Sequence, residues 1–499
     1  MTNRIYLYEL ESYKRATPQQ IKSMYMSADR FFDLDELPNE TLREEMRAFL
    51  MERGNRLSIT SIAREVPAYN LVCRFVNEKE RKLCSFRDKP IKEQERKLKA
   101  WLMKQGFKIS YARSSIVYPE KSPADVGSVA FLKKLYRFLE PADNRAEQEK
   151  DVWELKKLDI QLIDNPIRSV HKLNFKPIKQ QEMREELKTV IFMELKNVAV
   201  GTVLSEMSAF KRFSKYLAEK KPEVQSCKDI DRDVIESYLT YLNTEVIKKS
   251  FRTELIYIKT LLSLVGKVYD REDLGELFFT GDIPSEVRTL YRTYTDNEIA
   301  RLNTHIVQMN EQIARALIIH QMLGTRISDT LTLPPDCLYQ KNGGYIIKVK
   351  QVKSSYYEKP VSEELAALIQ KAISYTKERY GESRYIFVCE NDPSRPYQYS
   401  MIQNQVMNMI HREDLRDDNG ELFGFNTHLF RHTYGRKLTE MHLDDYTIAR
   451  LLGHTGTGSV KYYRKLSNSA LEQETREMRE EMDSILLDLV KGWEEYGEI

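Results

Sequence analysis

The 499-residue sequence is poor in cysteine and has no long apolar run. Its five cysteines are odd in number and show no CxxC spacing, which argues against a disulfide framework and against a zinc ribbon. The longest apolar runs are far too short to span a membrane, and the first residues, MTNRIYLYELESYKR, lack the apolar core of a signal peptide. These absences predict a cytoplasmic protein with buried free thiols.

Glycine is also scarce, with 19 residues in the whole chain, and long segments repeat their apolar residues at helical spacing. No internal repeat and no low-complexity tract is evident in the sequence. A chain of 499 residues is too long for one ordinary core, so we expect roughly two to four domains. The pattern predicts a mainly α protein with a small antiparallel β-sheet.

The net charge of +3 conceals an uneven distribution. Residues 470–499 contain 10 Asp or Glu and 3 Lys or Arg, so the rest of the chain carries 75 basic and 65 acidic residues. An acidic tail therefore masks a body with a net charge of +10. A basic body favours a polyanionic partner such as nucleic acid, although a solvated surface can have the same composition.

Four regions follow from the order of the elements. A stretch between Pro166 and Pro177 has no helical periodicity and is interpreted as a linker that closes the first region. The regions are residues 1–178, a helical bundle over residues 179–285, a mixed α/β domain over residues 286–470, and an acidic amphipathic helix over residues 471–499.

The second region has its apolar residues from Leu204 to Leu217 on one helical face. Two further amphipathic helices follow in DIDRDVIESYLTYLN and SFRTELIYIKTLLSLVG, the first with acidic capping residues. The basic residues lie on other faces, where they are either solvated or placed to contact the phosphates of a nucleic acid. The candidate contacts are Lys211, Arg212, Lys215, Arg252 and Lys259.

The third region holds the residues that carry chemistry. In IARALIIHQMLGTRISDTL a buried helix ends at Gly324, and Arg326 lies in the short turn before the next helix. In GGYIIKVKQVKSSYYEKPVS a Gly-Gly turn, alternating β-branched residues and a later polar break predict a small sheet with a basic tip. An arginine held between two apolar helices and a nearby lysine are thus brought into one domain.

Four of the eight histidines of the chain, His428, His432, His442 and His454, lie within residues 426–465. NTHLFRHTYGRKL places His428 and Arg431 three residues apart, so on a helix they share one face. An Asn or Thr at the start caps that helix and puts its positive end near the pair. A short helix in DDYTIARLLG ends before His454, and Tyr463, the second of two adjacent tyrosines, follows nine residues later.

These residue types can cleave a phosphodiester without a metal. Two arginines clamp the non-bridging oxygens and offset the charge of the pentavalent transition state. A lysine protonates the departing oxygen, a histidine exchanges the proton of the nucleophile, and a tyrosine attacks to form a covalent intermediate. A zinc site at His428, His432 and His454 is the alternative, but a metalloprotease helix needs a glutamate where Leu429 stands. We expect no metal and no cofactor.

In these stretches the sequence resembles the tyrosine recombinase (phage integrase) family, over roughly residues 180–470. GTRISDTLTL is similar to the first arginine box of the family, HLFRHTYGRKL to its His-x-x-Arg box, LLGH to the segment with the next histidine, and VKYYRK to the nucleophile segment. All of these boxes follow in the order and spacing of the family.

The resemblance implies a role for individual residues. The implied catalytic set is Arg326, Lys353, His428, Arg431, His454 and Tyr463. The lysine departs from the Gly-Lys-Gly or Lys-Thr-Lys pattern of the family hairpin, so Lys350 is the alternative to Lys353, and Tyr462 is the alternative nucleophile. Asp329 and His432 are expected as supporting residues, Asp329 through an ion pair with the first arginine.

The same resemblance implies a helical core-binding (SAM-like) bundle and a mixed α/β catalytic domain that form a C-shaped clamp on double-stranded DNA. It implies cleavage and rejoining through a 3′-phosphotyrosine, without ATP or a divalent metal, in a tetramer on two recombination sites. The long first region suggests a mobile-element integrase or transposase that acts on nucleoid DNA, with accessory proteins where the element requires them. A type IB topoisomerase and a non-catalytic DNA-binding accessory protein are the alternatives.

The two ends of the chain indicate further contacts. The tail carries an apolar stripe on an otherwise acidic helix, which we expect to dock on a neighbouring protomer rather than to pack in cis. The stripe consists of Met478, Met482, Ile485, Leu489 and Trp493. In the first region, LSITSIAREV and the segment after it have helix-turn-helix character. Extra DNA contact and protein–protein packing are both open for that region.

Overall fold

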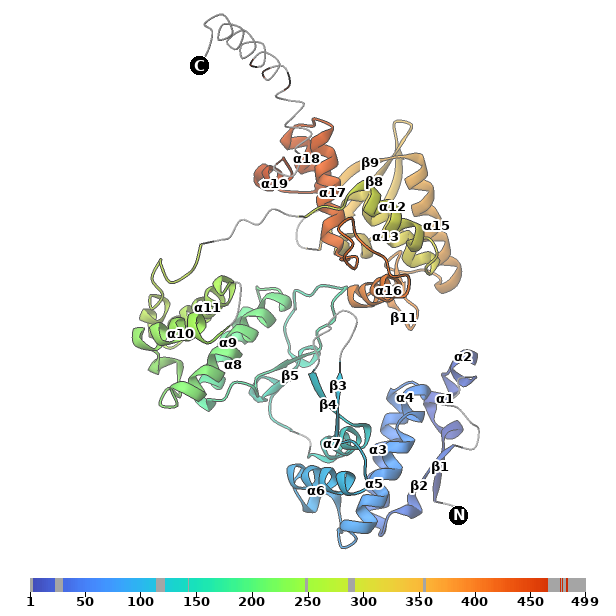
Figure 1. The fold of residues 1–499 in the computed structure, drawn as a ribbon, viewed down its shortest axis with the longest axis vertical. Coiled ribbons are helices and arrows are strands. Elements are labelled where there is room, and N and C mark those ends of the chain that lie inside the picture. The colour runs from blue at the N-terminus through green and yellow to red at the C-terminus, as the bar shows by residue number, and fades with distance from the viewer. Residues whose placement is uncertain are drawn as a thin grey trace, which may run out of the picture. The chain divides into compact units, whose positions relative to one another are not determined.

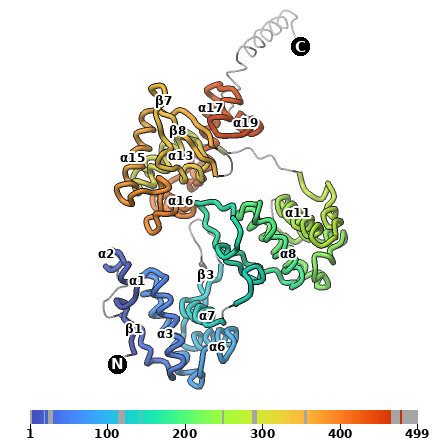
Figure 2. Tube along the Cα trace, turned by 180° about the vertical axis from the view of Figure 1, so that it is seen from behind, coloured from blue at the N-terminus to red at the C-terminus, as the bar shows by residue number. Residues whose placement is uncertain are grey.

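The computed structural model describes residues 3–22, 30–113, 122–141, 143–246, 250–285, 292–352 and 356–464, together with Arg476, Met478 and Met482. The chain divides into two compact units, Met1–Asn144 and Arg145–Ile499. Helices dominate both units, and the described strands form five small antiparallel sheets (Figures 1 and 2). The predicted mainly α fold with small antiparallel β-structure is confirmed.

The amino-terminal unit is a helical bundle that begins with a two-stranded ladder. In this ladder β1 (Arg4–Tyr6) pairs with β2 (Phe31–Asp33). The helices of the unit are α1 (Glu11–Lys14), α2 (Pro18–Ile21), α3 (Glu40–Arg56), α4 (Ile59–Ala63), α5 (Val66–Lys79), α6 (Ile91–Lys104) and α7 (Gly127–Leu139). A second ladder, β3 (Ser110–Arg113) with β4 (Ser122–Asp125), comes between α6 and α7 in the chain. Apolar side chains of α3, α5, α6 and α7 share one buried core.

A second helical bundle opens the larger unit. Here β5 (Val152–Glu154) pairs with β6 (Lys172–Asn174). The helices are α8 (Gln181–Glu194), α9 (Val200–Lys220), α10 (Arg232–Thr244) and α11 (Arg252–Val268). The predicted apolar face of α9 is buried at Met207, Phe210, Phe213 and Leu217. The stretch interpreted as a linker is not free, because β6 lies within it and Leu173 and Phe175 are buried in the bundle core.

Residues 292–464 form the part of the larger unit that holds the predicted catalytic residues. Its helices are α12 (Asp296–Ile306), α13 (Glu311–Leu323), α14 (Ile327–Leu331), α15 (Glu363–Tyr380), α16 (Tyr399–Arg412), α17 (Thr427–Glu440), α18 (Asp445–Leu452) and α19 (Val460–Arg464). The strands β7 (Leu338–Lys341), β8 (Gly344–Lys350) and β9 (Tyr356–Val361) form one sheet in that order, and β10 (Val388–Cys389) pairs with β11 (Asp392–Pro396). The buried helix α13 packs against α14, α15 and α17.

The predicted turn before β8 is shifted by one residue. Asn342 and Gly343 have positive φ angles of 53° and 80° and form the two-residue turn, while Gly344 already pairs with Lys341. Two residues with positive φ between paired strands are typical of the type I′ hairpin turn, which matches the twist of the strands.

The units do not coincide with all the regions expected from the sequence. The first compact unit ends at Asn144, whereas the expected boundary lies near residue 178. The boundaries near residues 285 and 470 adjoin stretches outside the described residues. These boundaries stay predictions.

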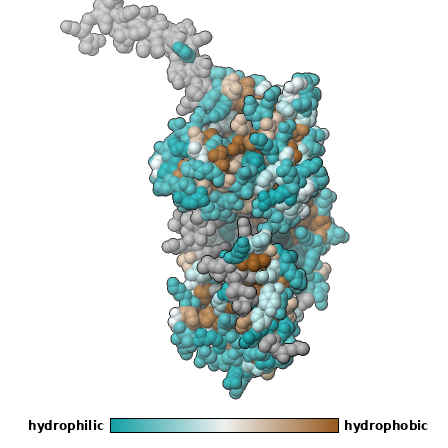
Figure 3. Space-filling view, turned by 90° about the vertical axis from the view of Figure 1, so that its right-hand side faces the viewer, coloured by the Kyte–Doolittle hydropathy of each residue, from teal (hydrophilic) through white to brown (hydrophobic). Residues whose placement is uncertain are grey.

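In the described part of the chain, no helix combines the length and apolar character needed to cross a membrane. The face of the molecule in Figure 3 is mostly hydrophilic, with small separate hydrophobic patches.

Two carboxyl groups are buried next to each other in the second bundle. Glu194, at the end of α8, is 9% exposed, and Glu206 of α9 is 4% exposed. Burial and the neighbouring Glu206 raise the pKa of Glu194 to about 8. Burial also raises the pKa of Glu206. The pair therefore holds a proton at neutral pH, because two adjacent charges are unfavourable away from water.

Stability should depend on pH through this pair. The folded chain binds a proton at Glu194 up to a pKa of about 8, whereas the ordinary value is 4.5. The free energy of unfolding therefore falls as pH rises between these values, since the folded state holds the extra proton there. We expect Glu194→Gln to raise the melting temperature by several degrees at pH 8 and to change it little at pH 5. Thermal unfolding followed by circular dichroism, with the exposed Glu219→Gln as control, measures this; equal shifts at both pH values would contradict it.

Candidate active site

The first arginine of the site lies at the start of a short helix. The preceding helix, α13, stops at Gly324, whose φ of 60° turns the chain. A Cβ at this position would lie 2.3 Å from the Tyr434 ring, so glycine is required by both the angle and the space. Arg326 then takes the N-cap position of α14. Its Nη1 atom is buried and has no hydrogen-bond acceptor among the described residues, so part of its hydrogen-bonding capacity is unused.

Asp329 connects this arginine to the end of β8. Its Oδ2 lies 3.8 Å from Nη1 of Arg326, which is the expected ion pair at long range. Its Oδ1 accepts hydrogen bonds from the backbone N–H of Val352 at 3.0 Å and from the Ser328 hydroxyl at 3.2 Å. Burial raises the pKa of this carboxyl. The aspartate thus fixes the strand end that leads directly to Lys353.

The helix α17 carries the His-x-x-Arg pair. Asn426 caps it, with Oδ1 accepting from the N–H of His428 at 2.9 Å, a contact typically worth about 1 kcal/mol. His428 is exposed, whereas Arg431 is only 4% exposed. Arg431 donates from Nη1 to the carbonyl of Gly324 at 2.9 Å and from Nη2 to that of Leu452 at 2.8 Å. Both carbonyls lie at the C-terminal ends of helices, where the helix dipole favours a cation.

His454 follows the end of α18, where Gly453 has a φ of 65°. Its Nε2 lies 2.7 Å from Nη2 of Arg431. Because the guanidinium can only donate, Nε2 accepts this bond and the proton of the neutral ring is assigned to Nδ1. Burial and then the charges of Arg431 and Arg326 lower the pKa of His454 to about 4. The imidazole is therefore neutral at physiological pH.

Tyr463 is buried on α19 against α17. Its ring centroid lies 6.3 Å from that of His454 and 5.9 Å from that of His432. A Cβ at Gly435 of α17 would come within 2.7 Å of the tyrosine ring, so this glycine makes room for the ring. Tyr463 also belongs to a small core that holds α17, α18 and α19 together, to which Leu452 contributes.

The structure thus brings Arg326, Arg431, His454 and Tyr463 into one cluster. The remaining predicted residues take different places. His428 lies on the same helix as Arg431, with its ring centroid 6.3 Å from that of His432. Lys353 lies outside the described residues, Lys350 is exposed at the end of β8, and Tyr462 is half-buried beside Tyr463.

The candidate DNA contacts of the second bundle do not form one open basic surface. Arg212 donates at 2.8 Å to a buried carboxylate of α11, and burial lowers the pKa of Lys211. Arg252 and Lys259 donate to backbone carbonyls. Lys215 is the most exposed of the five. Contact of these residues with DNA stays a prediction.

Sequence reasoning missed Lys359 of β9. Its side chain is 3% exposed, and its ammonium donates to the carbonyl of Leu323, with the Tyr434 hydroxyl at 3.3 Å and the carbonyl of Leu451 at 3.4 Å. Burial and then the charge of Arg431 lower the pKa of Lys359 to about 7. Leu323 and Leu451 directly precede Gly324 and Leu452, whose carbonyls Arg431 binds. The alternation along β9 is a signal for this position, because it puts Lys359 on the inward face.

His320 of α13 is the second residue that the sequence did not single out. It is fully buried, with Nδ1 3.0 Å from the Thr330 hydroxyl of α14 and Nε2 3.1 Å from the carbonyl of Thr427 in α17. Burial lowers its pKa to about 4. The neutral ring therefore ties the helix of the first arginine to the helix of the second, which no helical periodicity reveals.

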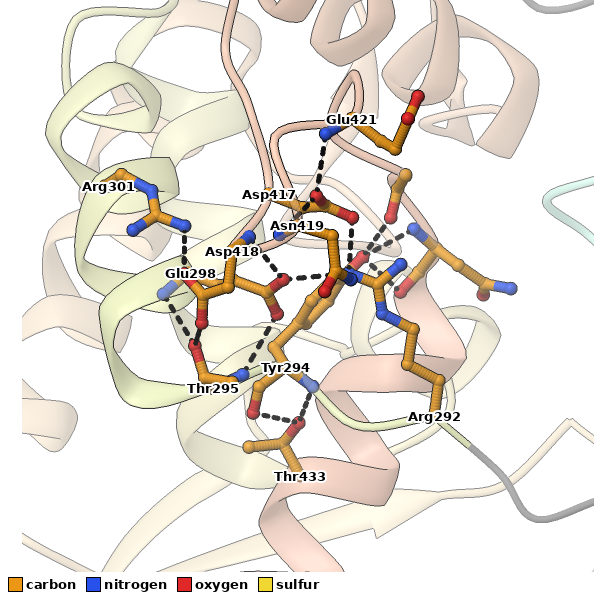
Figure 4. A network of polar contacts seen from close by, with 12 residues as sticks. Arg292, Tyr294, Thr295, Glu298, Arg301, Asp417, Asp418, Asn419, Glu421 and Thr433 are labelled. Carbon is orange, nitrogen blue, oxygen red and sulfur yellow. Dashed lines mark hydrogen bonds and ion pairs between the residues drawn. The ribbon is translucent and has the colours of Figure 1, made fainter.

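A polar network fastens the start of this domain to α17 (Figure 4). The backbone N–H of Tyr294 donates to the Thr433 hydroxyl of α17 at 2.9 Å, and the Tyr294 hydroxyl accepts from the N–H of Asn426 at 2.8 Å. Arg292 donates to two buried carboxylates, Glu298 and Asp417, at 2.8 and 2.9 Å. The chain that enters the domain is thus bound to the helix that carries His428 and Arg431.

The arrangement suits an anion with several oxygens. Of the five N–H groups of an arginine side chain, three of Arg431 are engaged by the two carbonyls and His454, which leaves two for a ligand. The buried Nη1 of Arg326 supplies another donor. No group of three or more His, Cys, Asp or Glu side chains that could hold a metal occurs in the described part of the chain.

Comparison with known proteins gives three kinds of match. Residues 292–469 match the model of the phage integrase family. Transposase B from transposon Tn554 of Staphylococcus aureus (strain Mu50 / ATCC 700699) is 26% identical over 467 residues, which cover 91% of this chain and 74% of that protein. Tyrosine recombinase XerH of Campylobacter jejuni is 21% identical over 346 residues, 66% of this chain and 93% of that protein. The crystal structure of XerH bound to difH substrate has a TM-score of 0.43 at 16% identity and covers 58% of this chain and 83% of that chain.

The region matched by the family model contains the whole cluster of arginines, histidine and tyrosine. The chain is therefore an enzyme of the tyrosine recombinase class. Residues 292–469 match the phage integrase family, and most of the chain is similar to a transposase of a mobile element.

The position of Tyr463 should depend on Gly435. A methyl group at Gly435 would lie 2.7 Å from the tyrosine ring, so Gly435→Ala displaces the ring. We expect covalent attachment of Tyr463 to a nicked DNA duplex to slow by about tenfold to a hundredfold, because a small displacement of a reacting group is costly. Single-turnover assays on denaturing gels measure this. Gly424→Ala is the control, since a Cβ there meets no atom within 4 Å; equal rates for both variants would refute the proposed packing.

Lys359 should affect the rate more than the binding of DNA. Lys359→Met leaves the carbonyls of Leu323 and Leu451 without this donor, next to the segments that hold Arg326 and His454. We expect the cleavage rate to fall roughly tenfold to a hundredfold, as for other residues that orient a catalytic group, with little change in DNA affinity. The exposed Lys348→Met on β8 is the control. A matching loss of DNA affinity for Lys359→Met would instead indicate direct contact with DNA.

Proposed function

We propose that this tyrosine recombinase cuts and rejoins DNA strands to move a mobile element, by site-specific recombination or transposition. The observation that carries the proposal is the cluster of Arg326, Arg431, His454 and Tyr463 inside the region that matches the family. Its two arginines keep donors for a phosphate, and a buried tyrosine lies beside them. The likeness to a named transposase over most of the chain supports a mobile element as the context.

In the proposed reaction the phenolic oxygen of Tyr463 attacks the scissile phosphorus. The bond from phosphorus to the 5′ oxygen of the next nucleotide breaks, and the tyrosine keeps the 3′-phosphate as an ester. The departing 5′ oxygen takes a proton from Lys353, with Lys350 as the alternative donor. Arg326 and Arg431 neutralise the charge on the non-bridging oxygens as the pentavalent state forms.

The two histidines divide the remaining work. Since Nε2 of His454 already accepts from Arg431, its Nδ1–H is suited to donate to a phosphate oxygen rather than to take a proton. His428, which is exposed in the first turn of α17, is then the residue that accepts the phenolic proton. Asp329 and His432 support this set, Asp329 by holding the first arginine and the lysine strand.

Rejoining reverses these steps. A 5′-hydroxyl of the partner strand attacks the phosphotyrosine, the P–O bond to Tyr463 breaks, and the phenol regains its proton. One phosphodiester is replaced by another, so neither ATP nor another energy source is needed.

Double-stranded DNA is the proposed partner, bound mainly through phosphates and therefore sensitive to salt. We propose a tetramer on two recombination sites, with residues 471–499 docked on a neighbouring protomer. Met478 and Met482, two residues of the apolar stripe, are more than half exposed in the single chain. The place of action is the nucleoid in the cytoplasm, with accessory proteins where the element requires them.

The test is a suicide duplex from the end of the element, nicked so that cleavage is trapped, and incubated in EDTA. We expect a covalent protein–DNA band for the wild type and for Tyr462→Phe, and none for Tyr463→Phe. A band that survives Tyr463→Phe but not Tyr462→Phe would move the nucleophile by one residue. Tight sequence-specific binding without any band would support a non-catalytic accessory role instead.

A further inference from the structure

The amino-terminal unit repeats the architecture of the second bundle. Each begins with a two-stranded antiparallel ladder, β1 with β2 in one and β5 with β6 in the other. Ile5 faces Phe32 in the first ladder and Trp153 faces Leu173 in the second, and all four side chains are buried. Phe32 and Leu173 are 141 positions apart in the chain.

The helices that follow keep the same separation. The helices α5 and α9 end 141 residues apart, at Lys79 and Lys220, and α6 and α10 begin 141 residues apart, at Ile91 and Arg232. One register thus aligns the second ladder strands, β2 and β6, and three helices, α3, α5 and α6 with α8, α9 and α10, without a gap, while the first strands, β1 and β5, lie 148 positions apart. Unrelated bundles have no reason to share one spacing over more than 70 residues.

A side-chain motif identifies the register in detail. In the second bundle, Glu186 of α8 accepts hydrogen bonds from the Ser226 hydroxyl at 2.5 Å and from the N–H of Cys227 at 2.7 Å. Asp229 accepts from the N–H of Ser226 at 2.9 Å and closes a capping box. A buried glutamate therefore fixes a Ser-x-x-Asp turn before α10.

The amino-terminal unit contains the same motif 141 positions earlier. Glu45 of α3 accepts from the Ser85 hydroxyl at 2.6 Å and from the N–H of Phe86 at 2.9 Å, and Asp88 accepts from the N–H of Ser85 at 2.9 Å. The glutamates lie in the related segments LREEM and MREEL. The chain therefore contains an internal repeat, contrary to the expectation from the sequence, because burial and capping are kept while most residues have changed.

One buried pair has diverged between the copies. Arg53 and Glu65 form a salt bridge in the amino-terminal unit, with Nε and Oε2 2.6 Å apart. The equivalent positions in the second bundle are Glu194 and Glu206, the carboxyl pair that holds a proton. The same two positions interact in both copies, which supports the register.

The copies differ most in charge. Residues 1–144 contain 27 basic and 20 acidic residues, whereas residues 145–285 contain 24 of each. Residues 81–108, which include α6, have 10 basic and 3 acidic residues. The equivalent residues 222–249, which include α10, have 4 basic and 6 acidic residues. The excess positive charge of the amino-terminal unit is therefore concentrated on α6 and its flanking turns.

Six exposed cations of this segment have no ion pair among the described residues. We name them the α6 basic face: Arg81, Lys82, Lys92, Arg96, Lys104 and Lys108. Lys92 and Arg96 lie one turn apart and line a shallow depression on α6 that Met103 also borders. Other basic residues nearby are neutralised, as Lys97 is by Glu80 at 2.8 Å. Like charges held on one segment repel each other unless a polyanion binds.

We propose that the amino-terminal unit is a second DNA-binding bundle, and that the α6 basic face contacts the phosphates of a duplex segment outside the one held by the second bundle. The inference rests on the proposed function only for DNA as the partner. In the second bundle the candidate contacts lie on α9 and α11, whereas the exposed cations of the amino-terminal unit are concentrated on α6 and its flanking turns. Duplex DNA, with one negative charge per about 1.7 Å of axis, suits a segment that carries six exposed cations.

The test uses the full-length chain with Lys92→Glu and Arg96→Glu combined. Binding is measured against salt on two duplexes, one limited to the cleavage site and one extended on both sides. On the extended duplex we expect the salt slope to fall by about 2 and the Kd to rise by about tenfold, because two phosphate contacts are lost. On the short duplex we expect no change in Kd or in covalent product. The control combines Lys22→Glu and Arg56→Glu, which alters the charge equally elsewhere in the unit.

Three results would overturn the inference. Equal losses on both duplexes would show that the α6 basic face does not act on flanking DNA. An equal loss in the control would show that overall charge is responsible. No loss on either duplex, with a change in sedimentation, would assign the face to a protein partner such as the acidic tail of another copy. The wild type could form no covalent product while the Lys92→Glu, Arg96→Glu variant still loses affinity on the extended duplex alone. In that case the proposed function fails and this inference stands.

Discussion

The buried guanidinium of Arg431 is the interaction on which the site depends. It binds the carbonyls of Gly324 and Leu452 and the ring of His454, so one side chain joins α13, α17 and α18. Burying a charge away from water costs free energy. Here the oriented carbonyls at two helix C-termini offset that cost by their interaction with the cation. The same bonds hold Arg326 and His454 at the place where an anion must bind.

Lys359 contacts the ends of the same two helices, α13 and α18, one residue before the carbonyls that Arg431 binds. Its ammonium contacts the carbonyls of Leu323 and Leu451, so two buried cations fasten the same pair of helix ends. Their mutual repulsion adds to burial in lowering the pKa of Lys359 to about 7. A lysine with a pKa of about 7 can lose its proton at neutral pH, which relieves the repulsion from Arg431.

The two helical bundles show how one scaffold can take different roles. The ladder, the order of the helices and the glutamate that fixes the Ser-x-x-Asp turn are common to both, and these are the features that burial and capping require. Surface charge is free of that requirement, and the two copies differ in it. The chain therefore contains the same bundle architecture twice, with a different distribution of charge in each copy.

The sequence predicted mainly those features whose signal lies within a few neighbouring residues. Helical periodicity, the glycine stops at Gly324 and Gly453, and the cap at Asn426 place the boxes on their helices. The turn before β8 was expected one residue too late, since Asn342 and Gly343 are both able to adopt positive φ. The strand β6 was missed because its partner β5 lies outside its own sequence neighbourhood.

The sequence by itself determined which types of residue make up the site, from Arg326 to Tyr463, and their order along the chain. Only the tertiary structure decided that Lys359 binds residues 36 and 92 positions away, and that Arg431 reaches a carbonyl 107 positions away. The repeat of the helical bundle also became visible only in three dimensions. The physical reason is the same in each case: capping and periodicity act over a few residues, whereas burial and the partners of a buried charge depend on how distant segments pack.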